Sequence, residues 1–357
     1  PDRRIEIKSR GNNAIIKGYG HFDDRLVAVS VLASYVTIEG FQIEVSPTPI
    51  SNQSRGIRVS GIHGRHARGV TIRRNKIARA GWVGITTSYA DDIVIEQNEV
   101  WGSHREHGIY VANSGDRPVV RANIVHDNGE AGIQLNADPD LPGDAIISGA
   151  IVEGNIVYRN GKRGSAAINL ASVRDSRIVN NLLYDNYSQG IASWDDDAGE
   201  KFGCKNNQYL HNTVVMPVGA YHALVLRHGS TNNVVKNNIL LHLGERDGFA
   251  SDASSMVGLV SDHNLMTHVE DNDRQLIPLR EWQTRRGQDR HSLTATAQEV
   301  FANLEQADYR LAARSPAIDR GDAVDSVAHD LPGTARPQGK APDIGAYELT
   351  AQTARTP

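Results

Sequence analysis

The fold is decided by residues 108–131, whose sequence is GIYVANSGDRPVVRANIVHDNGEA. Three short apolar runs lie in this stretch, namely Ile109-Tyr110-Val111, Val119-Val120-Arg121 and Ile124-Val125-His126, and turn-forming residues separate them. Alternation along a strand sends one set of side chains inward and the other set outward. The stretch therefore predicts three short β-strands joined by turns, which together make one coil.

The same two signatures recur along the chain. The first, Gly/Ala-Ile/Leu-x-apolar, occupies residues 56–59, 84–87, 108–111, 132–135, 167–170, 190–193 and 223–226. The second is an asparagine followed by apolar residues, found at Asn75, Asn98, Asn123, Asn155, Asn181, Asn212, Asn238 and Asn264. These asparagines are 23, 25, 32, 26, 31, 26 and 26 residues apart. Short β-runs at such a period are typical of a parallel β-solenoid, an all-β fold.

The recurring asparagines predict a corner between the second and third strands of each coil. We expect them to occupy tight turns, where asparagine tolerates the left-handed backbone conformation. Stacked coils bring equivalent side chains about 4.8 Å apart. Each amide can then bond the next one and satisfy polar groups that would otherwise cost about 1–3 kcal/mol each.

The repeat also predicts how the chain is divided. Residues 1–265 are expected to form the solenoid, and residues 266–357, where the repeat fades, a C-terminal capping segment that packs on it. Residues 137–148 and 194–204 lengthen two of the turns, and insertions in repeat proteins often build the binding face. Pro278 to Trp282, followed by Gly287, predicts a short helix in the capping segment.

Composition excludes several classes of protein. The net charge is −4, whereas a nucleic-acid-binding surface is normally strongly basic. No apolar run approaches the roughly 18 residues that a membrane span needs. Cys204 is the single cysteine, which rules out an intramolecular disulfide framework and a cysteine-based zinc site. We therefore expect neither a nucleic acid nor a membrane span among its interactions, while exposed solenoid edges permit an oligomer.

The chain resembles the right-handed parallel β-helix proteins, in particular the bacterial β-helix repeat group that includes carbohydrate-active enzymes. Besides the asparagine series, the resemblance is carried by residues 106–114 (EHGIYVANS), 315–319 (SPAID) and 343–348 (DIGAYE). It implies a polysaccharide or oligosaccharide substrate and a secreted or periplasmic location. Pectate and alginate lyases, mannuronan epimerases and glycoside hydrolases share these features. The Asp-Pro-His-Asp motif of the epimerases does not occur here, and no catalytic residues are carried over from any subfamily.

A binding groove is expected on the outer face of the first sheet, as in related β-helix enzymes. Seven coils there would span about 29 Å, enough for an oligosaccharide. Asparagine is a poor residue for exposed strands, so the outward positions of Asn136 and Asn169 suggest ligand contact. The predicted substrate-binding residues are Gln134, Asn136, Asn169, Trp194, Arg163 and Arg227.

The leading functional prediction is a lyase that cleaves an acidic, uronate-containing glycan by β-elimination. A base removes the proton beside the uronate carboxylate, and a cation stabilises the anion that forms. His107 or His104 is the predicted base and Tyr110 the predicted acid. Arg105, Lys162 or Arg163 is the predicted neutralising cation.

Two other functions stay open at this point. Glycoside hydrolysis uses two carboxylates that flank the bond, and Asp138 or Asp140 could pair with Asp195 or Asp196 from the two insertions. Glu106 is a further candidate carboxylate. A non-catalytic carbohydrate-binding surface protein could use the same groove. No cofactor is certain, but Asp138, Asp140 and Asp144 partly resemble a calcium-binding loop.

Overall fold

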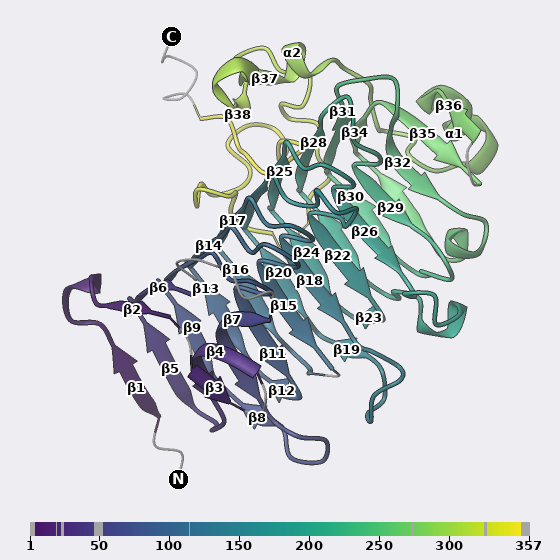
Figure 1. Ribbon diagram of the computed structural model, residues 1–357. Helices are drawn as coiled ribbons and strands as arrows, with labels where there is room; N and C mark the ends of the chain where they lie inside the picture. The colour runs from purple at the N-terminus through teal and green to yellow at the C-terminus, as the bar shows by residue number, and fades with distance from the viewer. Residues whose placement is uncertain are drawn as a thin grey trace.

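The computed structural model describes residues 4–18, 20–22, 25–45, 53–113, 115–272, 275–324 and 327–350. The chain winds into a stack of coils, and each coil contributes one strand to each of three long sheets (Figure 1). Successive coils pair in parallel through the body of the stack. The runs predicted within residues 108–131 are strands β15 (Ile109–Ala112), β16 (Val119–Arg121) and β17 (Ile124–His126). The predicted parallel β-helix is confirmed.

The three sheets are called A, B and C, and the coil of residues 109–126 passes through sheet C, then A, then B. Within each sheet, the strands below follow one another in space. Sheet C contains β3 (Gly20–Phe22), β4 (Arg25–Val31), β7 (Ser54–Ser60), β11 (Ile85–Ser88), β15, β18 (Ile133–Asn136), β22 (Ile168–Ala171), β26 (Ile191–Trp194), β29 (Leu224–Leu226), β32 (Asp247–Ser251), β35 (His268–Asp271) and β36 (Gln275–Ile277). Sheet A contains β1 (Ile5–Lys8), β5 (Val36–Glu39), β9 (Thr71–Arg73), β13 (Val94–Glu96), β16, β20 (Ile151–Glu153), β24 (Arg177–Val179), β27 (Gln208–Leu210), β30 (Val234–Lys236) and β33 (Val260–Asp262). Sheet B contains β2 (Ile15–Lys17), β6 (Gln42–Glu44), β10 (Lys76–Ala78), β14 (Glu99–Trp101), β17, β21 (Ile156–Tyr158), β25 (Leu182–Tyr184), β28 (Thr213–Met216), β31 (Ile239–His242) and β34 (Leu265–Met266).

Short elements complete the structure. Small strand pairs are β8 (Ala67–Arg68) with β12 (Ala90–Asp91), β19 (Ile147–Ser148) with β23 (Val173–Arg174), and β37 (Phe301–Asn303) with β38 (Asp308–Leu311). The α-helices are α1 (Leu279–Arg286) and α2 (Ala297–Val300), and 3₁₀ turns lie at Arg10–Asn12, Glu200–Phe202, Ser254–Met256 and Leu304–Gln306. In the described part of the chain, every helix is too short or too polar to cross a bilayer.

The core is a column of aliphatic side chains enclosed by the three sheets. Ile109 pairs in register with Ile133, and both side chains are fully buried, as are Val111 and Leu135 two residues further on. Burying an aliphatic side chain of this size contributes about 1.5–3 kcal/mol. Because the register repeats from coil to coil, the residues between the buried ones form continuous rows on the outside.

The predicted asparagine ladder is present at the corner between sheets A and B. From Asn75 to Asn264, each side-chain amide donates to the amide oxygen of the next asparagine, over 2.9–3.1 Å. Each amide has a second acceptor in a backbone carbonyl of sheet A, as when Asn123 Nδ2 donates to Ile95 at 2.9 Å. The ladder therefore satisfies polar groups that lie inside the corner.

The expectation that these asparagines adopt the left-handed conformation is wrong. The left-handed residue is the one before each asparagine: φ is 55° at Arg74, 56° at Gln97 and 52° at Ala122. That preceding residue makes the bend. The asparagine is retained for its buried amide, which bonds the next coil and the neighbouring strand.

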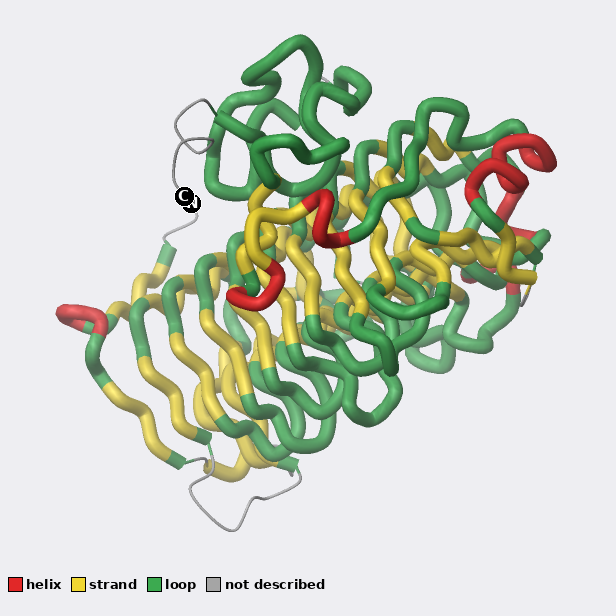
Figure 2. Tube along the Cα trace, turned by 90° about the horizontal axis from the view of Figure 1, so that it is seen from above, coloured by secondary structure: helices red, strands yellow, loops and turns green. Residues whose placement is uncertain are grey.

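The C-terminal part of the chain covers both the end and one side of the stack. Strands β35 and β36 extend sheet C beyond residue 265, so strand pairing continues past the predicted boundary. The predicted helix is α1, whose buried Trp282 packs edge-on against Phe249 of the last coils, with ring centroids 5.9 Å apart. Residues after α1 lie over one side of the stack (Figure 2). They pack on sheet B, where Phe301 and Ile344 join a buried cluster with Leu182 and Ile239.

Candidate active site

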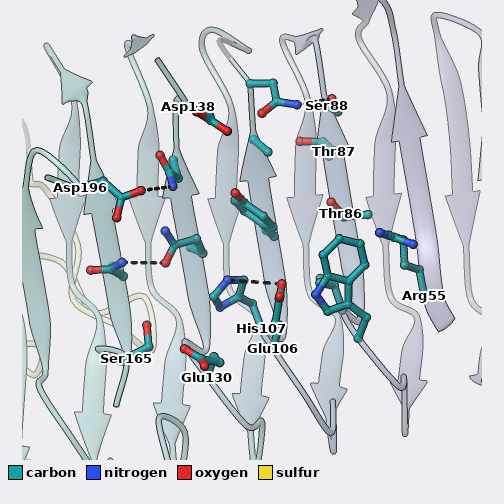
Figure 3. A pocket seen from close by; sticks show the side chains of 18 of the residues that line it. Arg55, Thr86, Thr87, Ser88, Glu106, His107, Glu130, Asp138, Ser165 and Asp196 are labelled. Atoms are coloured by element: carbon teal, nitrogen blue, oxygen red, sulfur yellow. Dashed lines mark hydrogen bonds and ion pairs between the residues drawn. The ribbon is translucent and has the colours of Figure 1, made fainter. Parts of the chain in front are cut away.

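A groove of about 650 Å³ lies along the outer face of sheet C. It crosses strands β7, β11, β15, β18, β22 and β26, so each of these coils contributes side chains to it (Figure 3). Strand alternation explains the lining. Ile109 and Val111 fill the core, which leaves Tyr110 between them to point outward into the groove.

A row of polar side chains forms the floor of this groove. Strand register places Tyr110 beside Gln134, and Gln134 beside Asn169, on successive coils, as predicted. The Asn169 amide donates to Gln134 Oε1 at 2.8 Å, and Trp194 Nε1 donates to Asn169 Oδ1 at 3.1 Å. Gln134 and Asn169 point outward and line the groove, but they are only 4% and 7% exposed. Their neighbours cover them, and the floor is fixed by its own hydrogen bonds.

The turns that precede the strands of sheet C form the first rim. Glu106 Oε2 lies 4.0 Å from His107 Nε2, and Glu130 Oε1 lies 4.0 Å from Arg163 Nε. Burial lowers the pKa of His107 to about 4, so its imidazole is neutral at pH 7. Burial and the negative charge of Glu106 raise the pKa of Glu130, against the opposing effect of Arg163.

The two insertions and the end of β18 form the second rim. Asn136 is the last residue of β18, Asp138 begins the first insertion, and Asp196 lies in the second. Asn136 Nδ2 donates to Asp196 Oδ2 at 2.8 Å (Figure 3). Burial raises the pKa of Asp196, the Asn136 hydrogen bond lowers it, and nearby carboxylates including Asp138 raise it again; the net shift is upward.

Tyr110 lies between the two rims. Burial raises the pKa of its hydroxyl, and the negative charges of Glu106, Asp196 and Asp138 raise it further. The phenol therefore stays protonated at neutral pH and can donate a hydrogen bond. Carboxylates from both rims therefore act on the same phenol.

Several predicted catalytic residues lie outside the groove. Arg105 is exposed in a turn, and the ammonium of Lys162, also exposed, lies 5.1 Å from the centre of the Tyr187 ring. Asp195 is buried, and its carboxylate accepts from Gly199 N and from His228 Nδ1, both at 2.8 Å. Asp195 therefore holds its own loop in place, and its neighbour Asp196 is the residue that reaches the groove.

The aspartates of the first insertion do not share a binding point. Asp138 Oδ1 accepts from the backbone N–H of Asp140 at 2.9 Å, and Asp144 Oδ1 accepts from that of Ile146 at 3.0 Å. Among the described residues, these three carboxylates do not come within 4.8 Å of one another as a set. Two of them stabilise turns of the loop instead.

The groove continues in both directions along the stack. Toward the N-terminus, the Arg55 guanidinium lies 3.6 Å from the centre of the Trp82 ring, so this aromatic face is covered by a cation. Toward the C-terminus, Asn169 and Trp194 also line an adjoining pocket of about 260 Å³. Arg227, a predicted substrate-binding residue, lies in that pocket and is paired with Glu270.

Among the carboxylates of the groove, Glu130 is the one that the sequence did not point to. It stands three positions before Ile133, as Glu106 stands three positions before Ile109. Since the isoleucines are in register, the two glutamates occupy equivalent positions on neighbouring coils. The repeat phase that defines the strands could therefore have located Glu130 as well.

Comparison with known proteins supports the architecture. Residues 12–164 match the protein family described as a right handed beta helix region, which confirms the resemblance stated above and the right-handed parallel β-helix. No curated protein sequence matches the chain.

Solved structures with the same architecture include carbohydrate-active enzymes. A glycoside hydrolase has a TM-score of 0.51 at 13% identity, over 60% of this chain and 48% of that one. The structure of XylC with xylose has a TM-score of 0.51 at 11% identity, over 89% and 65% of the two chains. An alginate lyase from Paenibacillus sp. str. FPU-7 has a TM-score of 0.45 at 16% identity, over 76% and 84%. The chain spans only 57% of the Dettilon tailspike protein, which also matches. At these identities the likeness shows the fold alone.

Proposed function

We propose that the protein hydrolyses glycosidic bonds of a polysaccharide bound in the groove over sheet C. One observation carries this proposal: four carboxylates from the two rims line the groove together with Tyr110. Three of them, Glu106, Asp138 and Asp196, raise the pKa of Tyr110, and the fourth is Glu130. Glycoside hydrolysis needs one protonated and one ionised carboxyl group near the bond, and burial raises the pKa of two of these four groups, Glu130 and Asp196.

The roles follow from the electrostatics of each rim. Glu130 and Asp196 have raised pKa values, so they are the candidates for the general acid that protonates the leaving oxygen. Glu106 and Asp138 supply negative charge that contributes to those shifts, and they are the candidates for the base or nucleophile. Gln134 and Asn169, fixed by their hydrogen bonds, would position the sugar.

Hydrolysis fits the groove better than the β-elimination favoured by the sequence. Elimination from a uronate needs a cation near the substrate carboxylate. Of the three predicted cations, Arg105 and Lys162 lie outside the groove, and Arg163, which lines it, lies beside the carboxylate of Glu130. The carboxylates at its centre would also repel a uronate. β-Elimination is nevertheless a second candidate, because the neutral imidazole of His107 packs edge-on against the protonated phenol of Tyr110, with ring centroids 5.0 Å apart.

The proposal is tested by digesting a panel of neutral and acidic glycans while following reducing ends and the ultraviolet absorbance of an unsaturated product. Hydrolysis releases reducing ends without that absorbance. E130Q, D196N and D138N should each lower kcat strongly, whereas K162A, outside the groove, should not. Unsaturated products that depend on His107 would instead establish the lyase, and affinity for a glycan without any product would establish a binding protein. Export from the cytoplasm belongs to this proposal, since extracellular glycans are the substrates it envisages.

A further inference from the structure

A cluster of one carboxylate and two imidazoles lies outside the groove, at the corner between sheets A and B. Asp262 ends β33, His263 follows it, and His291 comes from the segment after α1. Asp262 Oδ2 is 2.7 Å from His291 Nδ1 and 4.0 Å from His263 Nε2. One potential ligand atom from each residue lies within 4.8 Å of the other two.

Surrounding hydrogen bonds fix the direction of these atoms. Asp262 Oδ1 accepts from the backbone N–H groups of His263 and His291, at 2.9 and 2.8 Å, which leaves Oδ2 facing the imidazoles. His263 Nδ1 lies 2.9 Å from the carbonyl oxygen of Arg320. A carbonyl only accepts, so Nδ1 carries the proton and Nε2 keeps its lone pair. An imidazole oriented through a backbone carbonyl in this way is common around metal ions.

We propose that Asp262, His263 and His291 bind a divalent transition metal ion, with zinc as the best-fitting species. Tetrahedral zinc with bonds near 2.1 Å places its ligand atoms about 3.4 Å apart. The two measured separations, 2.7 and 4.0 Å, lie on either side of that value. The rings of His263 and His291 are stacked, with centroids 4.8 Å apart, so an ion would bind only after one imidazole rotates to direct its nitrogen at the same point as the other. Two nitrogen ligands and one oxygen favour zinc over calcium or magnesium, which prefer oxygen ligands.

Two other clusters of histidine and carboxylates are less suited to a metal ion. In the first, His222, Asp247 and Glu270 lie together, but the Arg227 guanidinium already pairs with Glu270. The second consists of Asp195, Asp197 and His228, and there Asp195 uses both carboxylate oxygens to accept backbone N–H groups of its own loop. Asp262 differs because one of its oxygens is directed at both imidazoles.

Zinc at this site would connect three parts of the chain. Asp262 and His263 belong to the last coils, His291 to the segment that follows α1, and Arg320 to the part that covers sheet B. A ligand that binds only the folded state stabilises it, so zinc should raise the unfolding temperature. This inference does not depend on the proposed glycosidase activity.

The test is titration of EDTA-treated full-length protein with zinc chloride by calorimetry, together with thermal unfolding with and without zinc. The wild type should bind one zinc ion that H263A and H291A lose, with affinity lowered by more than the ~10–100-fold typical of outer-shell changes. H228A, which alters the second cluster, should bind like the wild type. If H291A does not fold, H291Q replaces it in the zinc titration. Unchanged zinc affinity in both H263A and H291A, loss of the zinc ion in H228A, or no zinc binding by the folded wild type would overturn the proposal.

Discussion

Asn136 and Asp196 are 60 residues apart in the sequence, yet the Asn136 amide donates to the Asp196 carboxylate at 2.8 Å. This bond joins the end of β18 to the second insertion and brings that loop over the groove (Figure 3). A loop carboxylate is thereby fixed by a residue on the rigid sheet. The first prediction follows from the charge that this bond stabilises.

Replacing Asn136 with alanine should move the pH dependence of activity upward. The amide stabilises ionised Asp196, so its loss raises the pKa of that carboxyl group above its already raised value. If Asp196 is the general acid, it stays protonated to higher pH and the alkaline limb of the kcat profile shifts to higher pH. The measurement is kcat against pH for the wild type and N136A.

Asn113 offers a matched control, since it also lines the groove but donates to Ser88 Oγ rather than to a carboxylate. N113A should leave both limbs of the profile in place. An unshifted alkaline limb in N136A would remove Asp196 from the role of general acid.

Trp194 provides a second prediction, because its indole has two separable roles. Its ring lines the groove, and its N–H donates to Asn169, which in turn donates to Gln134. W194F keeps an aromatic face but releases Asn169, whereas W194A removes both. We expect W194A to raise KM more than W194F does, because stacking on a sugar ring is lost only in W194A. Equal KM values in the two variants would show that the ring itself does not contact the substrate.

Much of this architecture could be predicted because it depends on repetition. Strand alternation and the phase of the isoleucines fix which residues share a row, so the alignment of Tyr110, Gln134 and Asn169 follows from the sequence. The same holds for the asparagine ladder, since each rung of it repeats the same buried amide contacts.

The loops could not be predicted in this way, because no period fixes where their side chains point. In the run from Asp195 to Asp197, the carboxylate of Asp195 points inward and accepts a hydrogen bond from the loop backbone. Asp196 and Asp197 have left-handed φ values of 54° and 60°, so their side chains do not follow the alternation of a strand. Arg105 and Lys162 lie in exposed turns, where strand alternation does not predict the direction of a side chain. The sequence therefore located the groove and named Asp138 and Asp196 among its candidates, but it could not separate them from their loop neighbours Asp140 and Asp195.

His107 makes the third prediction, which concerns stability against pH. Its folded-state pKa is about 4, below the ordinary value of 6.5, because burial disfavours the charged imidazole. In the unfolded chain His107 takes up a proton near pH 6.5, whereas in the folded protein it is protonated only near pH 4. The free energy of unfolding therefore decreases as the pH falls through this interval. The difference between these two pKa values of His107 corresponds to about 3 kcal/mol in the free energy of unfolding.

H107Q should show a shallower loss of unfolding free energy between neutral pH and the folded-state pKa, measured by urea denaturation. H268Q, at an exposed histidine, is the control and should follow the wild type. Parallel curves for H107Q and the wild type would contradict the assigned burial effect.

The asparagine ladder gives a fourth prediction. Asn123 is fully buried, donates to Ile95 and Asn155, and accepts from Asn98. N123A leaves several of these buried groups without partners, at about 1–3 kcal/mol each, so the free energy of unfolding should fall by at least about 3 kcal/mol. Asn206 is exposed and left-handed, and N206G should change stability by less than about 0.5 kcal/mol. A mild effect of N123A would mean that water replaces the missing amide.

The bend that precedes the ladder gives the last prediction, which separates backbone geometry from amide bonding. Ala122 is exposed and has φ of 52°, a conformation that costs an L-residue about 1–2 kcal/mol but glycine little. Glycine also loses more chain entropy on folding, about 0.5–1 kcal/mol, so A122G should stabilise the protein by about 0.5–1 kcal/mol. Ala302 is an exposed strand residue without positive φ, and A302G should destabilise the protein by a similar amount. If A122G were as destabilising as A302G, the left-handed bend would not be the source of strain at this corner.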